Sequence, residues 1–125
     1  LHARLNESPT LPPVYRDRLR GLVDRAVGFA RVVAADAARE ADARRATSAL
    51  YHVASAVTLA WEAVRVYERR GDARRLVLSR LVLDHRLSAR DPLAGEADAA
   101  QDRAGSLLLD EAPVTLADAT AVALR

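Results

Sequence analysis

The chain has 125 residues, a net charge of +2 and a composition dominated by 27 Ala, 18 Leu, 13 Val and 19 Arg, with no Lys. Its length fits a single domain that is large enough to bury a core. Ala, Leu and Arg are strong helix formers, and strand formers other than Val are scarce, so we expect an all-α fold. The lack of cysteine excludes disulfides, thiolate zinc sites and a cysteine nucleophile.

The longest stretch without a charged residue is 46–61, and its polar members are Thr47, Ser48, His52, Ser55 and Thr58. This stretch is too short and too polar for a transmembrane helix, which needs about 20 apolar residues. The N-terminus lacks the pattern of a signal peptide. We therefore expect a cytoplasmic protein without membrane contacts. Because the chain begins at Leu1 rather than Met, we also interpret it as part of a longer protein.

Charge is distributed unevenly along the chain. Residues 65–90 carry eight Arg against three acids, whereas residues 91–125 carry two Arg against seven acids. A basic segment of this kind would suit phosphate or nucleic acid. We favour neutralisation by the acidic tail and expect no nucleic-acid partner, because no aromatic residues are interleaved with the arginines as a stacking platform requires.

The predicted elements begin with an extended lead-in at residues 1–12, indicated by its prolines. Apolar residues spaced three and four apart then predict an amphipathic helix over about 13–39. The next apolar stripe starts at Leu50, far out of phase with the first. We therefore predict a break near 40–44, with Asp42 capping a second helix over about 43–70.

Gly71 is suited to end the second helix and Asp72 to cap a third helix over about 73–88. Leucine and valine point to nearly every side of this third helix, so we expect it to lie between layers or against a partner. His85 lies on the helical wheel between Leu78 and Leu81. We interpret it as an interior residue rather than a catalytic imidazole.

Two further helices complete the prediction. Asp91 and Pro92 are suited to start a helix over about 92–110. Thr115 and Asp118 have the spacing of a capping box and predict a last helix over about 115–124. The elements together predict an up-down helical bundle of four to five helices over residues 13–125.

The sequence contains no recognisable catalytic or metal-binding pattern. The three His residues lack helical metal-ligand spacing, and the five Gly residues are isolated rather than gathered in a phosphate loop. Ser48, His52 and Ser55 share one face of the second helix with Thr58 and Glu62, which would suit ligand contacts or acid–base chemistry. Nucleophilic catalysis would need a third, orienting group, so we favour protein–protein packing. The candidate interface residues are Ser48, His52, Ser55, Trp61, Arg80 and His85.

Three stretches resemble a known family: SALYHVASAVTLAWEA at 48–63, GDARRLVLSRLVLDHRLSARDPL at 71–93 and LLLDEAPVTLADA at 107–119. They are similar to the C-terminal helical region of bacterial acyl-CoA dehydrogenases. The resemblance implies a helical bundle that builds the oligomer interface and helps enclose FAD in an enzyme that oxidises acyl thioesters. Glu62 lacks the adjoining Gly-Thr pattern that would mark the glutamate base, so no catalytic residue is carried over.

The sequence therefore leads to two functional expectations. The first is a C-terminal domain of a flavin-dependent acyl-CoA dehydrogenase-like oxidoreductase, inactive alone, which forms a homo-oligomer and contacts the rest of the parent chain and its FAD. The alternative is a free-standing helical interaction module, whose Arg-rich 65–90 surface docks an acidic partner.

Overall fold

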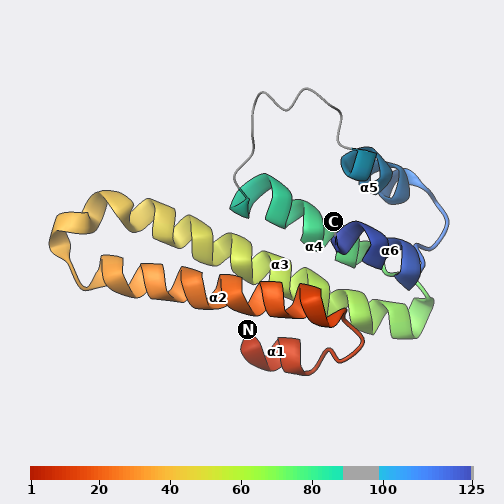
Figure 1. Ribbon diagram of the computed structural model, residues 1–125, viewed down its shortest axis with the longest axis horizontal. Coiled ribbons are helices and arrows are strands. Elements are labelled where there is room, and N and C mark those ends of the chain that lie inside the picture. The colour runs from red at the N-terminus through yellow and green to blue at the C-terminus, as the bar shows by residue number, and fades with distance from the viewer. Residues whose placement is uncertain (89–98, 125) are drawn as a thin grey trace.

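The computed structural model describes residues 1–88 and 99–124, and all regular structure in these ranges is helical (Figure 1). This confirms the predicted all-α bundle. The α-helices are α1 (His2–Asn6), α2 (Pro13–Ala34), α3 (Ala43–Arg70), α4 (Arg74–Val82), α5 (Ala99–Leu109) and α6 (Leu116–Ala123). A short 3₁₀ helix, η1 (Ala37–Asp42), joins α2 to α3, and a π-helical turn, η2 (Leu83–Leu87), follows α4.

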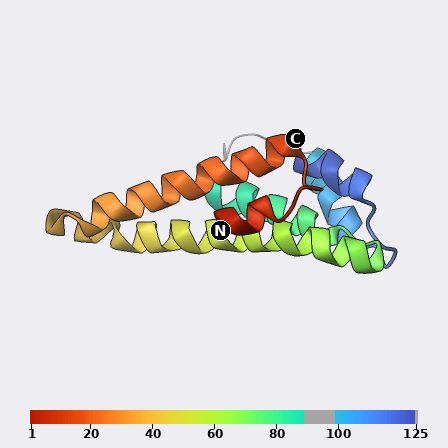
Figure 2. The ribbon, with the colours of Figure 1, turned by 90° about the horizontal axis from the view of Figure 1, so that it is seen from below.

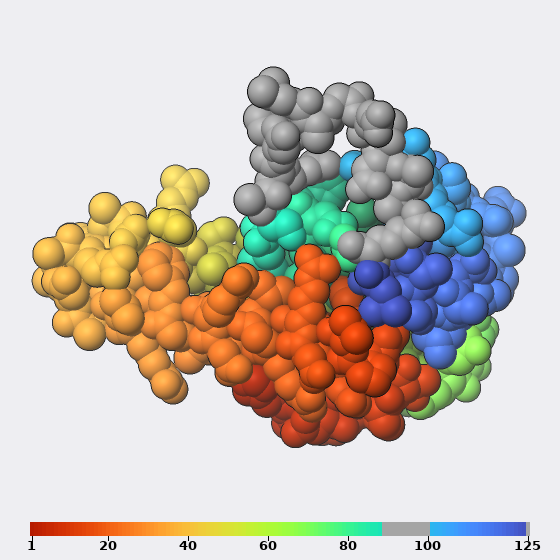
Figure 3. Space-filling model, viewed as in Figure 1, coloured from red at the N-terminus to blue at the C-terminus, as the bar shows by residue number. Residues whose placement is uncertain are grey.

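The two long helices α2 and α3 form a hairpin that organises the molecule. One end of the hairpin is covered by α1 and by the group of α4, α5 and α6, whereas the η1 end projects beyond them (Figures 1 and 2). Figure 3 shows this tip standing clear of the rest of the described surface. The molecule therefore has a packed end and a two-helix arm.

Helix α3 is the spine of the packed end. Its small and β-branched residues recur every three or four positions and are buried, among them Val53, Ala56, Val57 and Ala60. Alanine side chains let α2 and α4 approach α3 closely on different faces. The helix ends where predicted, because Gly71 adopts φ +69° and donates its N–H to the Tyr67 carbonyl at 2.8 Å.

A buried hydrogen-bond chain joins α2, α3 and α4. The Ser79 hydroxyl on α4 donates to the Ala56 carbonyl on α3 at 2.8 Å. Its oxygen lies 2.8 Å from the Tyr15 hydroxyl on α2, which therefore acts as the donor. Both side chains are at most 1% exposed. Burial raises the pKa of Tyr15 to about 12.

The first twelve residues are not an extended lead-in, and that prediction was wrong. Residues His2–Asn6 form α1, and both Leu5 and Leu11 are buried in the core. Arg4 on α1 donates to the Thr58 hydroxyl on α3 at 2.7 Å. Contacts with α3 thus stabilise a helix that is too short to form alone.

The break between the first two long helices differs in detail from the prediction. Helix α2 ends at Ala34 rather than about 39, because the Asp36 carboxylate accepts from the Ala38 N–H at 2.9 Å and starts η1. Asp42 does not cap α3 with its side chain, since its carboxylate binds Arg39 at 2.9 Å instead. The start of α3 at Ala43 matches the prediction.

Helix α4 lies between layers, as its all-round apolar sequence predicted. It packs against α3 on one side and against α6 and α5 on the other. Leu76 and Val77 are fully buried. The N-cap residue of α4 is Ala73 rather than the predicted Asp72. Asp72 lies one position earlier, and its carboxylate accepts from the Arg74 N–H, the first of the helix, at 2.9 Å. The helix ends at Val82, and the π turn η2 completes the segment predicted as helical to about 88.

The C-terminal segments follow the predicted caps where they are described. The Thr115 hydroxyl accepts from the Asp118 N–H at 3.1 Å and starts α6. The Thr115 hydroxyl also donates to the Asp118 carboxylate, and this bond lowers the pKa of Asp118. The predicted start of a helix at Asp91 and Pro92 lies outside the described residues, and α5 is described from Ala99.

The buried Tyr15 predicts a loss of stability at high pH. The pKa of the Tyr15 phenol is near 10 in the unfolded chain and about 12 in the folded protein. The free energy of unfolding should therefore fall by up to about 1.4 kcal/mol per pH unit across this range. Denaturant titrations should show this slope in the wild type and a flatter profile in Tyr15→Phe. Equal slopes for the wild type and Tyr15→Phe would contradict this assignment. Because the chain has no Lys and no Cys, few other groups titrate in this pH range.

Two glycines, one at the end of α3 and one inside α2, give a matched test of the left-handed cap. Gly71→Ala should cost about 1 kcal/mol of stability, because an L side chain is strained at φ +69° even though the added Cβ meets no neighbour. Gly28→Ala, within α2 and equally unobstructed, should instead stabilise by about 0.5–1 kcal/mol. Thermal and denaturant unfolding measure both. Equal effects of the two substitutions would contradict the assignment of the left-handed cap.

Candidate functional site

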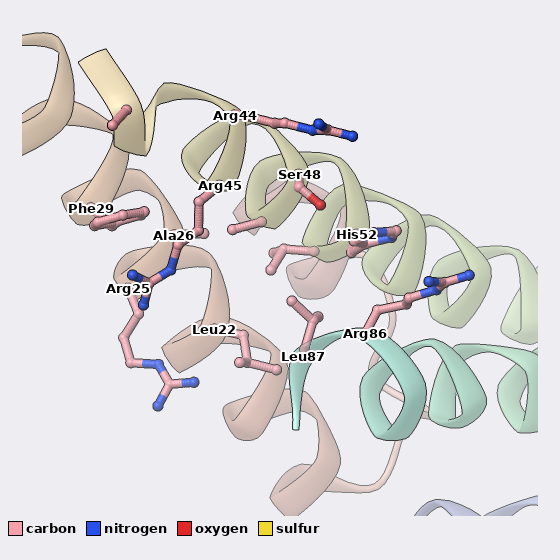
Figure 4. Close-up of a pocket in the computed structure, with 13 residues that line it drawn as sticks. Leu22, Arg25, Ala26, Phe29, Arg44, Arg45, Ser48, His52, Arg86 and Leu87 are labelled. Carbon is pink, nitrogen blue, oxygen red and sulfur yellow. The ribbon is translucent and has the colours of Figure 1, made fainter. Parts of the chain in front are cut away.

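A cavity of about 690 Å³ opens between α2, α3 and η2 (Figure 4). We call it the arginine pocket. Its polar rim consists of Arg25, Arg44, Arg45, Ser48, His52 and Arg86. Its apolar floor consists of Leu22, Ala26, Phe29, Ala41, Ala49, Val53 and Leu87. The pocket therefore combines cationic and hydrogen-bonding groups with an apolar base.

The local structure explains how these residues meet. Arg44, Ser48 and His52 follow one another at intervals of four on α3, so they form a row along one face of the helix. Arg25 belongs to the antiparallel stretch of α2. Arg86 comes from η2, and in Figure 4 its side chain runs toward His52. Three segments far apart in the sequence thus contribute to one rim.

The π turn positions the third wall of the pocket. Its wider turn is closed by the Ser88 N–H, which donates to the Leu83 carbonyl at 2.8 Å. Leu87 is half-buried and packs against the core, whereas Arg86 is exposed at the rim. Consecutive residues of η2 therefore supply the floor and the rim.

The pocket is strongly positive. None of the described residues that line it is acidic. Within the described part of the chain, the side chains of Arg25, Arg44 and Arg86 take part in no hydrogen bond or ion pair. Arg45 lies 4.0 Å from Asp42 and stacks over Phe29 with its guanidinium carbon 5.2 Å from the ring centroid. Guanidinium groups held without acidic partners are suited to bind carboxylate or phosphate.

The structure divides the predicted interface residues between the pocket and internal contacts. Ser48 and His52 line the arginine pocket, as described above. Ser55, one turn further along, donates its hydroxyl to the Tyr51 carbonyl of its own helix at 2.9 Å. The Ser–His face is therefore not assembled as a catalytic pair, because Ser55 is engaged with the backbone.

Trp61 joins α3 to the N-terminal segment. Its indole N–H donates to the Glu7 carboxylate at 3.1 Å. Arg4 and Arg65 stack on the ring, with guanidinium carbons 5.0 and 4.1 Å from the centroid. Cation–π contacts of this kind contribute about 0.5–1 kcal/mol each at exposed sites. Trp61 thus serves contacts within this chain.

Arg80 and His85, which were predicted to belong to one interface, lie in different environments: Arg80 is largely buried and His85 is exposed. The Arg80 side chain is 12% exposed, pairs with Asp84 at 2.7 Å and donates to the Ala123 carbonyl at 3.0 Å. It therefore ties α4 to α6. His85 is exposed, so its interpretation as an interior residue was wrong.

Sequence reasoning missed Arg25, Arg44 and Arg45 of the pocket because it placed the basic surface at 65–90, a segment that contributes Arg86 to the rim. Four arginines of that segment, Arg65, Arg74, Arg75 and Arg80, are engaged inside the chain. Arg74 donates to the Asp110 and Ala112 carbonyls at 2.7 and 2.9 Å, so the acidic tail meets the basic helix through its backbone. The available signal was the four-residue spacing of Arg44, Ser48 and His52.

Comparison of the chain with models of known protein families, with curated proteins and with solved structures finds no match. Over residues 1–88 and 99–124, no group of three or more His, Asp or Glu is arranged to hold a metal ion. None of the helices in these ranges combines the length and apolar character needed to cross a bilayer.

Arg80 and Arg86 provide a test of these assignments. Arg80→Ala should cost about 2 kcal/mol of stability, because it removes the charge-assisted hydrogen bonds that Arg80 donates to Asp84 of η2 and to the Ala123 carbonyl of α6. Arg86→Ala, six residues later and exposed, should change stability by no more than about 0.5 kcal/mol. Denaturant unfolding measures both. If Arg80→Ala left the stability unchanged, Arg80 would not stabilise the packing of α4 against α6, and the assignment would be wrong.

Proposed function

We propose that this chain is the C-terminal helical domain of a flavin-dependent acyl-CoA dehydrogenase-like oxidoreductase. In this role it serves subunit assembly and cofactor enclosure, and it is inactive alone. The proposal is supported by the resemblance of stretches 48–63, 71–93 and 107–119 to that region. It includes a cytoplasmic location, a homo-oligomer formed through the bundle, and contact with the rest of the parent chain.

The observation that carries the assembly role is the uncovered apolar surface of the two-helix arm. A cavity of about 450 Å³ near the tip is lined largely by apolar side chains, including Ala30, Val33 and Leu50. On the same arm, Val32 and Tyr51 are 51% and 67% exposed. Apolar surface on both helices of a projecting arm is typical of a contact with another subunit.

The described residues do not by themselves fit a complete flavin site. Gly21, Gly28 and Gly105 lie within helices, and Gly71 ends α3, so the described part of the chain offers no glycine-rich loop for a pyrophosphate. Enclosure of FAD would therefore need other segments or other subunits. No residue of this chain is assigned to FAD.

The longer protein that contains this chain tests the flavin role. It should purify with the absorbance of bound flavin and oxidise an acyl-CoA when coupled to an electron-accepting dye. A colourless protein that leaves acyl-CoA unchanged, even after incubation with FAD, would contradict the proposal.

A paired substitution tests the assembly role. Val32→Glu combined with Tyr51→Glu should weaken self-association by roughly tenfold or more, because charges would enter the apolar contact. Arg69→Ala combined with Arg70→Ala is the control, since it changes the net charge equally at exposed positions on the opposite end of α3. Light scattering coupled to size-exclusion chromatography measures both. Unchanged association of the first pair would exclude the arm as the interface.

A second candidate function is a free-standing interaction module that docks an acidic partner. Arg69 and Arg70 favour it, because both are exposed and have no ion pair within the described residues. Binding of an acidic peptide should then weaken steeply with salt, since exposed charges are screened beyond about 8 Å at physiological ionic strength. Self-association that is insensitive to salt would argue against this candidate and for the assembly role.

A further inference from the structure

The arginine pocket has features that neither the assembly role nor the docking role uses. Most of its polar lining residues lie on a different side from its aliphatic ones, while Arg25 lies near Leu22 on α2 (Figure 4). The row Arg44, Ser48 and His52 on α3 and Arg86 on η2 form the polar side, and Leu22 and Val53 belong to the apolar floor. In Figure 4, Leu22 and Leu87 point into the space below Ser48 and His52. A ligand in this space would meet cations at one end and hydrocarbon at the other.

The polar side is suited to an oxyanion. Arg44 and Arg86 are exposed, have no ion pair in the described part of the chain, and approach the rim from different segments. Ser48 adds a hydroxyl donor beside them, and His52 adds a ring nitrogen. Guanidinium groups form paired, charge-assisted hydrogen bonds with phosphate and carboxylate oxygens. The absence of acids from the described lining leaves this positive potential uncompensated.

The apolar floor and the volume of the cavity indicate the chemical character and size of the part of the ligand beyond its oxyanion group. Aliphatic side chains from α2, α3 and η2 make the floor, and Phe29 is already covered by Arg39 and Arg45. A flat aromatic group would therefore compete with Arg39 and Arg45 for the Phe29 ring. The volume of about 690 Å³ lies within the usual range for small-molecule sites, about 300–1,000 Å³.

We infer that the arginine pocket binds a small amphiphilic oxyanion, a phosphate or carboxylate carried on a short aliphatic chain. The head group is held by Arg44 and Arg86 beside Ser48 and His52, and the aliphatic chain lies on Leu22, Val53 and Leu87. This inference does not depend on the proposed function, because every residue it uses belongs to the described part of this chain.

Calorimetric titration of the full 125-residue chain tests this inference with four probes: hexyl phosphate, hexanoate, inorganic phosphate and hexanol. Hexyl phosphate or hexanoate should bind at least about tenfold more tightly than inorganic phosphate, a gain that burial of two methylene groups would supply. The tighter of the two identifies the head group. Hexanol should bind weakly or not at all. Binding of hexanol equal to that of the anions, or of inorganic phosphate equal to that of the alkyl anions, would overturn the inference.

Variants locate the binding in the pocket. Arg44→Ala combined with Arg86→Ala should weaken the preferred anion about tenfold or more, because two charge-assisted contacts are lost. Arg69→Ala combined with Arg70→Ala removes the same charge elsewhere and should change affinity less than about twofold. Circular dichroism checks that both fold.

A spectroscopic readout completes the test. The ring resonances of His52 should shift on titration, while those of His2, which bonds to Asp24, should not. Equal affinity in the two double variants would overturn the inference. Binding of an acidic peptide without binding of any small anion would overturn it as well, in favour of a protein-docking surface.

Discussion

The buried hydroxyl of Ser79 is the constraint on which the arrangement of the long helices depends. A hydroxyl that is cut off from water must be satisfied by protein groups, or folding is penalised by about 1–3 kcal/mol. Ser79 meets this requirement by donating to the Ala56 carbonyl and accepting from Tyr15. Because these three residues lie on α4, α3 and α2, satisfying one hydroxyl fixes the relative position of three helices. The small side chain of Ala56 allows the close approach that the bonds require.

This fixed end explains why the other end of the hairpin is available for contacts. Since α1, α4, α5 and α6 gather on the packed end, the arm near η1 keeps apolar residues on its surface and a positive pocket on its side. The π turn η2 lies where these two regions meet, and it supplies Arg86 and Leu87 to the pocket. The same packing that stabilises the core therefore positions both the apolar surface of the arm and the arginine pocket.

Local signals in the sequence were sufficient for the features that depend on neighbouring residues. The end of α3 at Gly71, the Thr115 cap and the all-α class follow from propensity, spacing and chirality. Features that depend on distant contacts were missed. Helix α1 exists because Leu5 is buried and Arg4 reaches Thr58. Of the prolines that indicated an extended segment, Pro12 and Pro13 mark the start of α2. The arginine pocket was missed for the same reason, since its walls come from three segments and its rim depends on a π turn that no propensity encodes.

A double-mutant cycle on Tyr15→Phe and Ser79→Ala tests the central constraint most directly. Each single variant and the double variant are unfolded in denaturant near neutral pH, where Tyr15 is protonated. If the two hydroxyls act as one unit that joins the helices, the cycle should give a coupling free energy of at least about 0.5 kcal/mol, within the range found for residues that share a network. Strictly additive effects of the two substitutions would contradict the account.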